Sequence, residues 1–324
     1  MNKTNKISVR TDLAMEACEL LSKEETYKGI ETEMKRTDGI EITTVRITND
    51  NVAEAVGKPK GTYISIEADK MKGADADFRQ KVIEITADML KTVLKSDSEK
   101  NILVAGLGNR YITPDSLGPK VVAKILVTRH IRDTLSDKID DSVASVAAIA
   151  PGVMGITGIE TAEILKGIAE RIKPDAVIAI DALAARRTSR INSVIQIADS
   201  GISPGSGVGN KRMLLNEESL GVPVIGIGIP TVVSAATLVN DSMERILSAM
   251  AEASEEKLFY NTLNNLGDER EALIAELLEP YAENMFVTPK EVDEVIERLA
   301  EIISNAINIA VHPALTKEDI NKYV

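Results

Sequence analysis

Several residue types are scarce in this chain of 324 residues, and each scarcity narrows the classes of protein to which it can belong. Cys18 is the single cysteine, so no internal disulfide can form, and a reducing compartment such as the cytoplasm is expected. His130 and His312 are the only histidines, which leaves little material for a histidine-rich metal site or a serine–histidine pair. One histidine with a few carboxylates could still hold a metal ion. Tryptophan is absent and aromatic residues make up 3% of the chain, so the core must be aliphatic.

The chain also lacks long hydrophobic runs and an excess of positive charge. No stretch of about 18 uninterrupted apolar residues occurs, so no membrane-spanning helix is predicted. Residues 1–12 are polar and basic, without the apolar centre of a secretory signal. The net charge of −12 argues against direct binding to nucleic acid or to an anionic membrane, and is compatible with a neutral or basic protein partner.

From about residue 96, short apolar runs alternate with segments of helical periodicity. This alternation predicts an α/β fold with a mostly parallel central sheet flanked by helices. Strands are expected at Ile102–Leu107, Val143–Ile149, Ala176–Ile180, Val194–Ile197 and Val222–Ile229. Helices are expected at Leu117–Arg129, Glu160–Ile172, Thr231–Met250 and Gly267–Glu279, and from the capping residue Thr288 to about Val311.

Residues 13–95 have a different pattern. A helix is expected at Leu13–Leu21, strands at Gly39–Ile47 and Thr62–Glu67, and a helix at Phe78–Leu94. We therefore divide the chain into a terminal segment 1–12, a β-rich N-terminal extension and helix at 13–95, and an α/β core with C-terminal helices at 96–324. The last two are expected to form one compact unit.

A glycine-rich segment, Gly205–Lys211, resembles a phosphate-binding loop without completing the motif. Asn210 replaces the glycine before the lysine, and Arg212 replaces the serine or threonine after it. The backbone N–H groups of this loop, that of Gly207 among them, could instead hold a carbonyl or carboxylate group. Lys211 and Arg212 would suit an acidic residue of a substrate. The alternative is a surface loop without a binding role.

The triplet Asp199-Ser200-Gly201 matches the D-[ST]-G signature of pepsin-like and retroviral proteases. Those enzymes present the triplet twice or in a symmetric dimer, within an all-β fold. Here it occurs once and in an α/β context, so we interpret it as part of a loop or the rim of a site.

Two carboxylates follow predicted strands of the core: Asp115 in TPDSLGP and Asp181 after the run AVIAI. In open α/β sheets, ligands bind in the crevice beyond the carboxyl ends of the strands. A charge at such a position must be solvated, paired or protonated. The structural alternatives are that Asp115 caps the helix at Leu117, and that Asp181 forms a salt bridge with Arg186 or Arg187.

If both carboxylates share one crevice, one of them will hold a proton more tightly because its neighbour is charged. Such a pair can polarise a water molecule and protonate a leaving amine, which is the chemistry of aspartic-type peptide hydrolysis. The two groups should then titrate as a unit.

Long characteristic runs extend over nearly the whole chain: SVRTDLA (8–14), TPDSLGP (113–119), LVTRH (126–130), PGVMGITGIET (151–161), KPDAVIAIDALAAR (173–186), SGISPGSGVGNKR (200–212), GVPVIGIGIPTVV (221–233) and MFVTPKEVD (285–293). Together they closely resemble the spore germination protease family of endospore-forming Firmicutes, an atypical group of aspartic peptidases. The resemblance implies an endopeptidase that degrades small acid-soluble spore proteins in the cytoplasm of the germinating spore. It also implies a homotetramer, a zymogen activated by self-cleavage, no cofactor, and a fold related to hydrogenase-maturation endopeptidases.

The resemblance also assigns roles to residues. The two catalytic aspartates of the family carry over to Asp115 and Asp181, and we expect Asp181, near Arg186, to stay ionised. Arg186, Gly207, Lys211 and Arg212 are candidates for binding the substrate.

The family cleaves after an acidic residue and before a hydrophobic residue followed by alanine. Asp12-Leu13-Ala14 fits this pattern, so residues 1–12 resemble a propeptide. Val9 stands where substrates of the family favour an acid, and the segment after Thr231–Met250 is shorter than in the family.

Two other functions remain open at this point. One is a metal-assisted endopeptidase of the hydrogenase-maturation type, in which Asp115 and Asp181 would be metal ligands. The other is a scaffold that binds spore proteins without cutting them.

Overall fold

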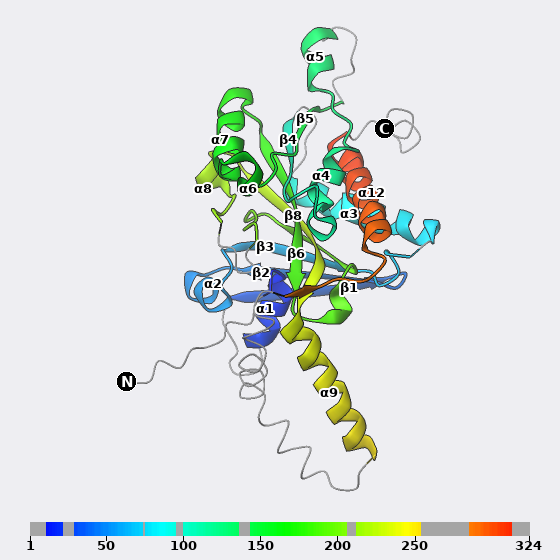
Figure 1. Cartoon of the computed structure of the whole chain (residues 1–324). Coiled ribbons are helices and arrows are strands. Elements are labelled where there is room, and N and C mark those ends of the chain that lie inside the picture. The colour runs from blue at the N-terminus through cyan, green and yellow to red at the C-terminus, as the bar shows by residue number, and fades with distance from the viewer. Residues whose placement is uncertain are drawn as a thin grey trace.

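The computed structural model describes residues 11–21, 29–73, 75–94, 100–135, 143–205, 212–253 and 285–312. These residues form one nine-stranded sheet with helices packed against it (Figure 1). The predicted α/β class, a central sheet flanked by helices, is confirmed. None of the helices in the described ranges combines the length and the apolar character needed to cross a membrane.

The elements follow one another along the chain with these bounds. The strands are β1 (Ile30–Thr37), β2 (Ile40–Ile47), β3 (Gly61–Glu67), β4 (Asn101–Gly106), β5 (Ser145–Ile149), β6 (Ala176–Ala185), β7 (Val194–Ala198), β8 (Val224–Ser234) and β9 (Phe286–Val287). The helices are α1 (Ala14–Leu21), α2 (Asp50–Val56), α3 (Ala76–Leu94), α4 (Leu117–Val122), α5 (Arg129–Leu135), α6 (Met154–Thr157), α7 (Thr161–Ile172), α8 (Glu217–Leu220), α9 (Ala235–Ala253) and α12 (Val292–Val311), with 3-10 turns η1 (Thr113–Asp115) and η3 (Thr188–Arg190).

The sheet has a parallel part and an antiparallel part. Its strand order is β1-β2-β3-β7-β8-β6-β4-β5, and β9 pairs with the end of β8. Strands β5, β4, β6 and β8 are parallel, whereas β7, β3, β2 and β1 continue the sheet in antiparallel pairs. The N-terminal extension therefore joins the core through the β3–β7 pair. β1 was not predicted, because IETEMKRT is almost wholly exposed and carries no apolar alternation.

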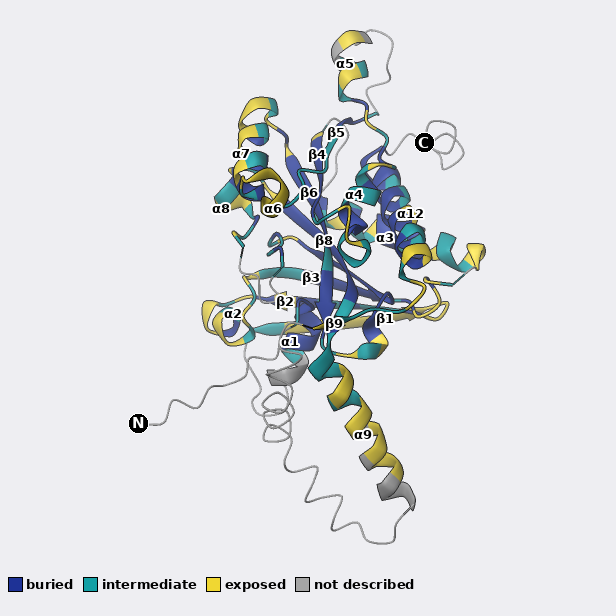
Figure 2. Ribbon diagram, viewed as in Figure 1, coloured by how far each residue is buried: buried dark blue, intermediate teal, exposed yellow. Residues whose placement is uncertain are grey.

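The core lies on both faces of the parallel strands, which is why β6 and β8 read as near-continuous apolar runs. Along β4, Val104 packs into the larger cluster under α3 and α12, and Leu103 into the smaller cluster under α7 and α8. Figure 2 shows the buried strands β6 and β8 between these two groups of helices.

Two predicted helices have different bounds in the structure. The helix expected at Leu117–Arg129 ends at Val122, and α5 begins at Arg129, because the intervening backbone bonds elsewhere. The N–H of Leu126 donates to Asn308 Oδ1 of α12 (3.0 Å), and that of Thr128 to the carbonyl of Val146 in β5 (3.0 Å).

The strand expected to end at Ile229 continues through Ser234, so α9 starts four residues later than predicted. Helix α12 begins at Val292 with Glu291 at its N-cap position. Thr288 is therefore not its cap; the Thr288 hydroxyl donates to the carbonyl of Thr231 (2.9 Å). The helix predicted at Gly267–Glu279 lies outside the described residues.

Candidate active site

Asp115 ends the turn η1 that follows β4. Its Oδ2 accepts a hydrogen bond from the N–H of Asn109 (2.7 Å), so the carboxylate closes its own loop. The N-cap of α4 is Ser116, so the alternative interpretation of Asp115 as that cap is wrong. Gly108 makes the closed loop possible: its φ is +103°, and a Cβ there would lie 2.1 Å from the carbonyl oxygen of Asp115.

A second glycine brings this turn against the sheet. Gly118, in the first turn of α4, lies so close to the strands that a Cβ would stand 2.3 Å from Leu107 O and 2.7 Å from Ile180 O. The N–H of Leu107 donates to Ile180 O (2.8 Å), so the residue that follows β4 is still bonded to β6. The turn bearing Asp115 therefore lies where β4 ends and β6 continues.

Asp181 is the first residue of β6 beyond its last pair with β4, Gly106 with Ile180. The strand continues past it to Ala185, so Asp181 lies within β6 and not after its end as the sequence suggested. Its side chain is 3% exposed and accepts hydrogen bonds from the N–H groups of Ala182 (3.0 Å) and Gly205. Among the described residues Asp181 forms no ion pair, so the predicted salt-bridge alternative is not observed.

The two carboxylates interact electrostatically, and their environments differ. Burial, then the charges of Asp115 and Asp12, raise the pKa of Asp181 well above its usual value. Burial also raises the pKa of Asp115, but the Asn109 hydrogen bond and the charge of Arg212 oppose that rise. Burial thus favours the protonated form at both groups and most strongly at Asp181, while the charge of Arg212 favours the ionised form of Asp115. The direction of the pKa shift of Asp181 opposes the expectation that it stays ionised, since the cation that favours an ionised form, Arg212, acts on Asp115.

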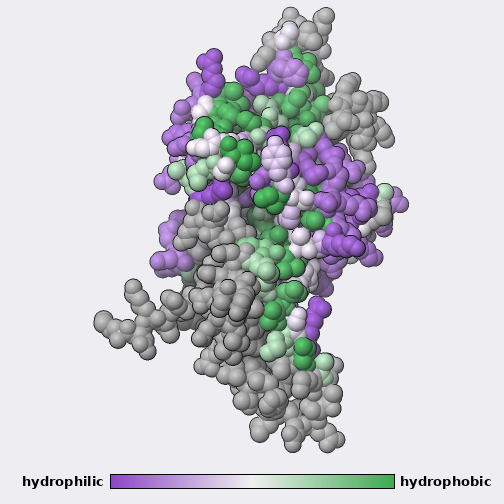
Figure 3. Space-filling view, in the orientation of Figure 1, coloured by the Kyte–Doolittle hydropathy of each residue, from purple (hydrophilic) through white to green (hydrophobic). Residues whose placement is uncertain are grey.

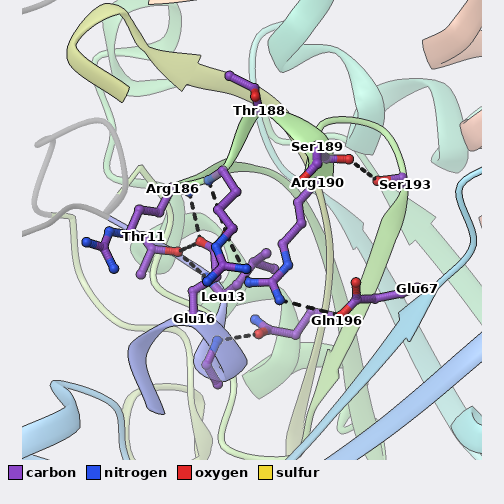
Figure 4. A network of polar contacts seen from close by, with 12 residues as sticks. Thr11, Leu13, Glu16, Glu67, Arg186, Thr188, Ser189, Arg190, Ser193 and Gln196 are labelled. Atoms are coloured by element: carbon purple, nitrogen blue, oxygen red, sulfur yellow. Dashed lines mark hydrogen bonds and ion pairs between the residues drawn. The ribbon is translucent and has the colours of Figure 1, made fainter. Parts of the chain in front are cut away.

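The other residues predicted to bind a substrate fall in different places. Arg212 is described, and its charge reaches Asp115. Gly207 and Lys211 lie outside the described residues. The Arg186 backbone N–H donates to Glu16 Oε2 (2.8 Å), within a polar network around α1 (Figure 4). A role of Arg186 toward a substrate stays a prediction.

Asp12 and Leu13, the predicted processing junction, are docked along the edge of β6 that β4 leaves open. The Asp12 N–H donates to Ala184 O (3.1 Å), and Asp12 Oδ2 accepts from the Ala184 N–H (2.9 Å). The Asp12 carbonyl accepts from Lys58 Nζ (3.0 Å) and Gln196 Nε2 (3.2 Å). Leu13 is fully buried in a small apolar cluster around the end of β6. The sequence indicated the junction but not its burial or its electrostatic influence on Asp181.

The triplet Asp199-Ser200-Gly201 has a structural role. Asp199 Oδ1 accepts from the N–H of Thr62 (2.6 Å), and the Ser200 hydroxyl donates to Tyr63 Oη (2.8 Å). These bonds tie the end of β7 to β3, in agreement with its interpretation as a loop.

The arrangement can therefore hold one proton between two carboxylates beside a cation and a backbone N–H donor. The sequence did not predict that the backbone N–H groups of Asn109 and Gly205 donate to the two carboxylates. The one signal was that each follows a turn residue, Gly108 or Pro204. Within the described ranges, no group of three or more histidine, cysteine or acidic side chains is arranged to hold a metal ion.

Comparison with known proteins agrees over the length of the chain. The family model described as germination protease matches residues 9–266 and 249–324. The chain is 49% identical to the germination protease of Clostridium acetobutylicum, over 98% of this chain and 99% of the relative. It is 40% identical to that of Bacillus cereus, over 98% of each chain. Among solved structures, it resembles the [NiFe] hydrogenase maturation protease HycI from Thermococcus kodakarensis, with a TM-score of 0.32, 18% identity, and coverage of 68% of this chain and 98% of that one.

Proposed function

The chain belongs to the germination protease family, whose members are endopeptidases, and we propose that it hydrolyses peptide bonds by an aspartic-type mechanism with Asp115 and Asp181 as the catalytic pair. One observation carries this proposal. Asp115 and Asp181 are coupled electrostatically, and the one that is more deeply buried has its pKa raised most, as a protonated partner requires.

In the proposed reaction, the Asp115 carboxylate takes a proton from a water molecule as the water oxygen attacks the peptide carbonyl carbon. Asp181 donates its proton to the carbonyl oxygen, and the Gly205 N–H stabilises the carboxylate that this leaves. When the tetrahedral intermediate collapses, the proton on Asp115 passes to the leaving nitrogen, and Asp181 recovers its proton from the hydroxyl group. The C–N bond breaks without a covalent enzyme intermediate or a cofactor.

The proposed substrates are small acid-soluble spore proteins, cut after an acidic residue and before a hydrophobic one. The charge of Arg212 beside Asp115 supports binding of an acidic residue. Tyr111 and Ile112, in the loop leading to Asp115, and Met213, next to Arg212, are exposed apolar side chains that could contact a hydrophobic one. Figure 3 shows further hydrophobic residues at the surface over α6 and α7.

We further propose that the enzyme works as a homotetramer in the cytoplasm of the spore core. The net charge of −12 supports neutral or basic protein partners over nucleic acid. The full chain would be a zymogen in which residues 1–12 are the propeptide. The docking of Asp12 on Ala184 supports this, since the last residue of the proposed propeptide then lies on the same strand as Asp181.

Incubation of the purified full chain, alone and with a small acid-soluble spore protein, tests the proposal. Mass spectrometry should find substrate fragments that end in an acidic residue, and a processed enzyme that begins at Leu13. A chelator should leave both cuts unchanged. Intact substrate would support a scaffold, activity lost on chelation and restored by a metal ion would support a metallopeptidase, and another N-terminus would reject the junction.

Arg212→Gln should lower kcat/KM for an acidic cleavage site roughly 10- to 100-fold, since a hydrogen bond to a charged group contributes about 1.5–3 kcal/mol. Because Arg212 holds the pKa of Asp115 down, its removal raises that pKa, so the acid limb of the pH profile should move to higher pH. Arg212→Lys should restore the limb. An unchanged limb in Arg212→Gln would contradict a role of this cation at the site.

A further inference from the structure

One residue of β8 leaves the regular pairing next to Asp115. β6 and β8 pair in register from Val177 with Val224 to Leu183 with Pro230, and the next pair is Ala184 with Val232. Thr231 is thus the extra residue of a β-bulge. A bulge turns a backbone and its side chain away from the ladder, and bulges are enriched next to active sites.

The side-chain hydroxyl and the backbone carbonyl of Thr231 each bind a segment outside the β6–β8 pair. Thr231 Oγ1 donates to the carbonyl of Pro114 (2.7 Å), the residue that precedes Asp115 in η1. The Thr231 carbonyl accepts from the Thr288 hydroxyl (2.9 Å), which ties the segment between β9 and α12 to the same point. Thr231 is 1% exposed, so water does not compete for these bonds.

The Thr231 bond to η1 adds a side-chain hold from β8 to the close packing of Gly118 against Leu107 and Ile180. Asp115 itself bonds to Asn109 within its own loop, which fixes the carboxylate relative to the loop and not relative to β6. The Pro114 ring removes a backbone N–H that could otherwise anchor the turn, so its carbonyl is the group left to bind β8. The bond from Thr231 therefore fixes the loop bearing Asp115 against the strands bearing Asp181.

We propose that Thr231 is a positioning residue, which sets the distance between Asp115 and Asp181 through the carbonyl of Pro114. This inference rests on the proposed function above. It extends the site to a residue that contacts neither substrate nor the reacting atoms, and it gives the bulge in β8 a purpose.

Thr231→Val tests the inference, because valine keeps the shape and removes the hydroxyl. kcat should fall about 10- to 100-fold with KM within about twofold, since a displacement of about 1 Å can cost 10²-fold. Thr231→Ser keeps the hydroxyl and should stay within about threefold of the parent. The alkaline limb of the pH profile should move to lower pH in Thr231→Val, because Asp181 loses part of the raising effect of Asp115. NMR titration of labelled aspartate carboxyl groups measures the same fall in the pKa of Asp181 without an activity assay.

Thr86→Val is the matched control for a buried threonine that loses its bond. Thr86 is fully buried in α3, and its hydroxyl donates to Val82 O (2.7 Å) away from η1. It should lower the urea midpoint and leave kcat and the pH profile unchanged. If Asp115→Asn is inactive, either of two results would overturn the inference. One is a Thr231→Val enzyme with the kcat and pH limbs of the parent, and the other is a fall in kcat in Thr86→Val equal to that in Thr231→Val. An active Asp115→Asn would remove the catalytic pair and, with it, the role given to Thr231.

Discussion

Replacing Asp181 or Asp115 by asparagine is expected to lower kcat by about a thousandfold or more, since a positioned acid or base contributes 10²- to 10⁴-fold and each residue serves in both steps. An asparagine in place of Asp181 could neither donate a proton to the carbonyl oxygen nor recover one. An asparagine in place of Asp115 could not accept a proton from water. The double variant should be little worse than either single one, because residues that act as a unit have non-additive effects. Substrate cleavage followed by mass spectrometry measures all three.

The fold should survive both changes, which makes the loss of activity interpretable. Asparagine has the shape of aspartate and retains a carbonyl oxygen, which can still accept from the Asn109 N–H at position 115 and from the Ala182 N–H at position 181. Asp199→Asn is the matched control, since Asp199 also accepts a backbone N–H in a loop but lies at the β7 end. Its activity should equal that of the parent. A single variant at 115 or 181 that cuts substrate at the parental rate would end the assignment.

The bell shape of the pH profile follows from the same pair. The proposed mechanism requires Asp115 ionised and Asp181 protonated. The acid limb should then report mainly the first and the alkaline limb mainly the second, as apparent values of a coupled pair. Burial raises the pKa of both carboxyl groups, and Arg212 opposes the rise at Asp115 alone. The window between the limbs therefore depends on the difference between the two environments.

Much of the fold could be predicted because its signals are local. β6 and β8 are buried on both faces and are near-continuous apolar runs, and α7 and α3 have clear helical periodicity. The errors arise where a distant segment decides the structure. The extension of β8 to Ser234 depends on its pairing with β6 and with β9, which is more than 50 residues away along the chain.

The site shows the same limit. Asp115 and Asp181 could be proposed as a pair because strand ends in a parallel sheet meet at one edge. The directions of the two pKa shifts could not be predicted, because they depend on the burial of Asp181 and on the position of Arg212 beside Asp115. The bulge at Thr231 left no local signal in the sequence either, since the helix was expected to start there.

The second large effect is expected on stability, from Glu16→Ala. Glu16 is in the first turn of α1, is 1% exposed, and binds the segment after β6 (Figure 4). It accepts from the N–H groups of Arg186 (2.8 Å) and Arg187 (3.3 Å) and from the Thr11 hydroxyl, and it pairs with Arg190 Nη1 (3.2 Å). Its removal takes one partner from the buried guanidinium of Arg190 and one from each of the part-buried N–H groups of Arg186 and Arg187. The free energy of unfolding should fall by about 3–5 kcal/mol, measured by urea unfolding.

Two further variants show whether the loss of stability comes from removing a buried charge or from removing any carboxylate. Glu16→Gln keeps an oxygen for the Arg186 N–H but not the charge opposite Arg190, so its loss should be intermediate. Glu33→Ala removes an exposed carboxylate that pairs with Lys35 and should leave the urea midpoint unchanged. Because α1 begins two residues after Asp12, Glu16→Ala should also loosen the junction and speed its cleavage in a chain that still folds. A Glu16→Ala midpoint equal to that of Glu33→Ala would show that α1 is not held to β6 by this carboxylate.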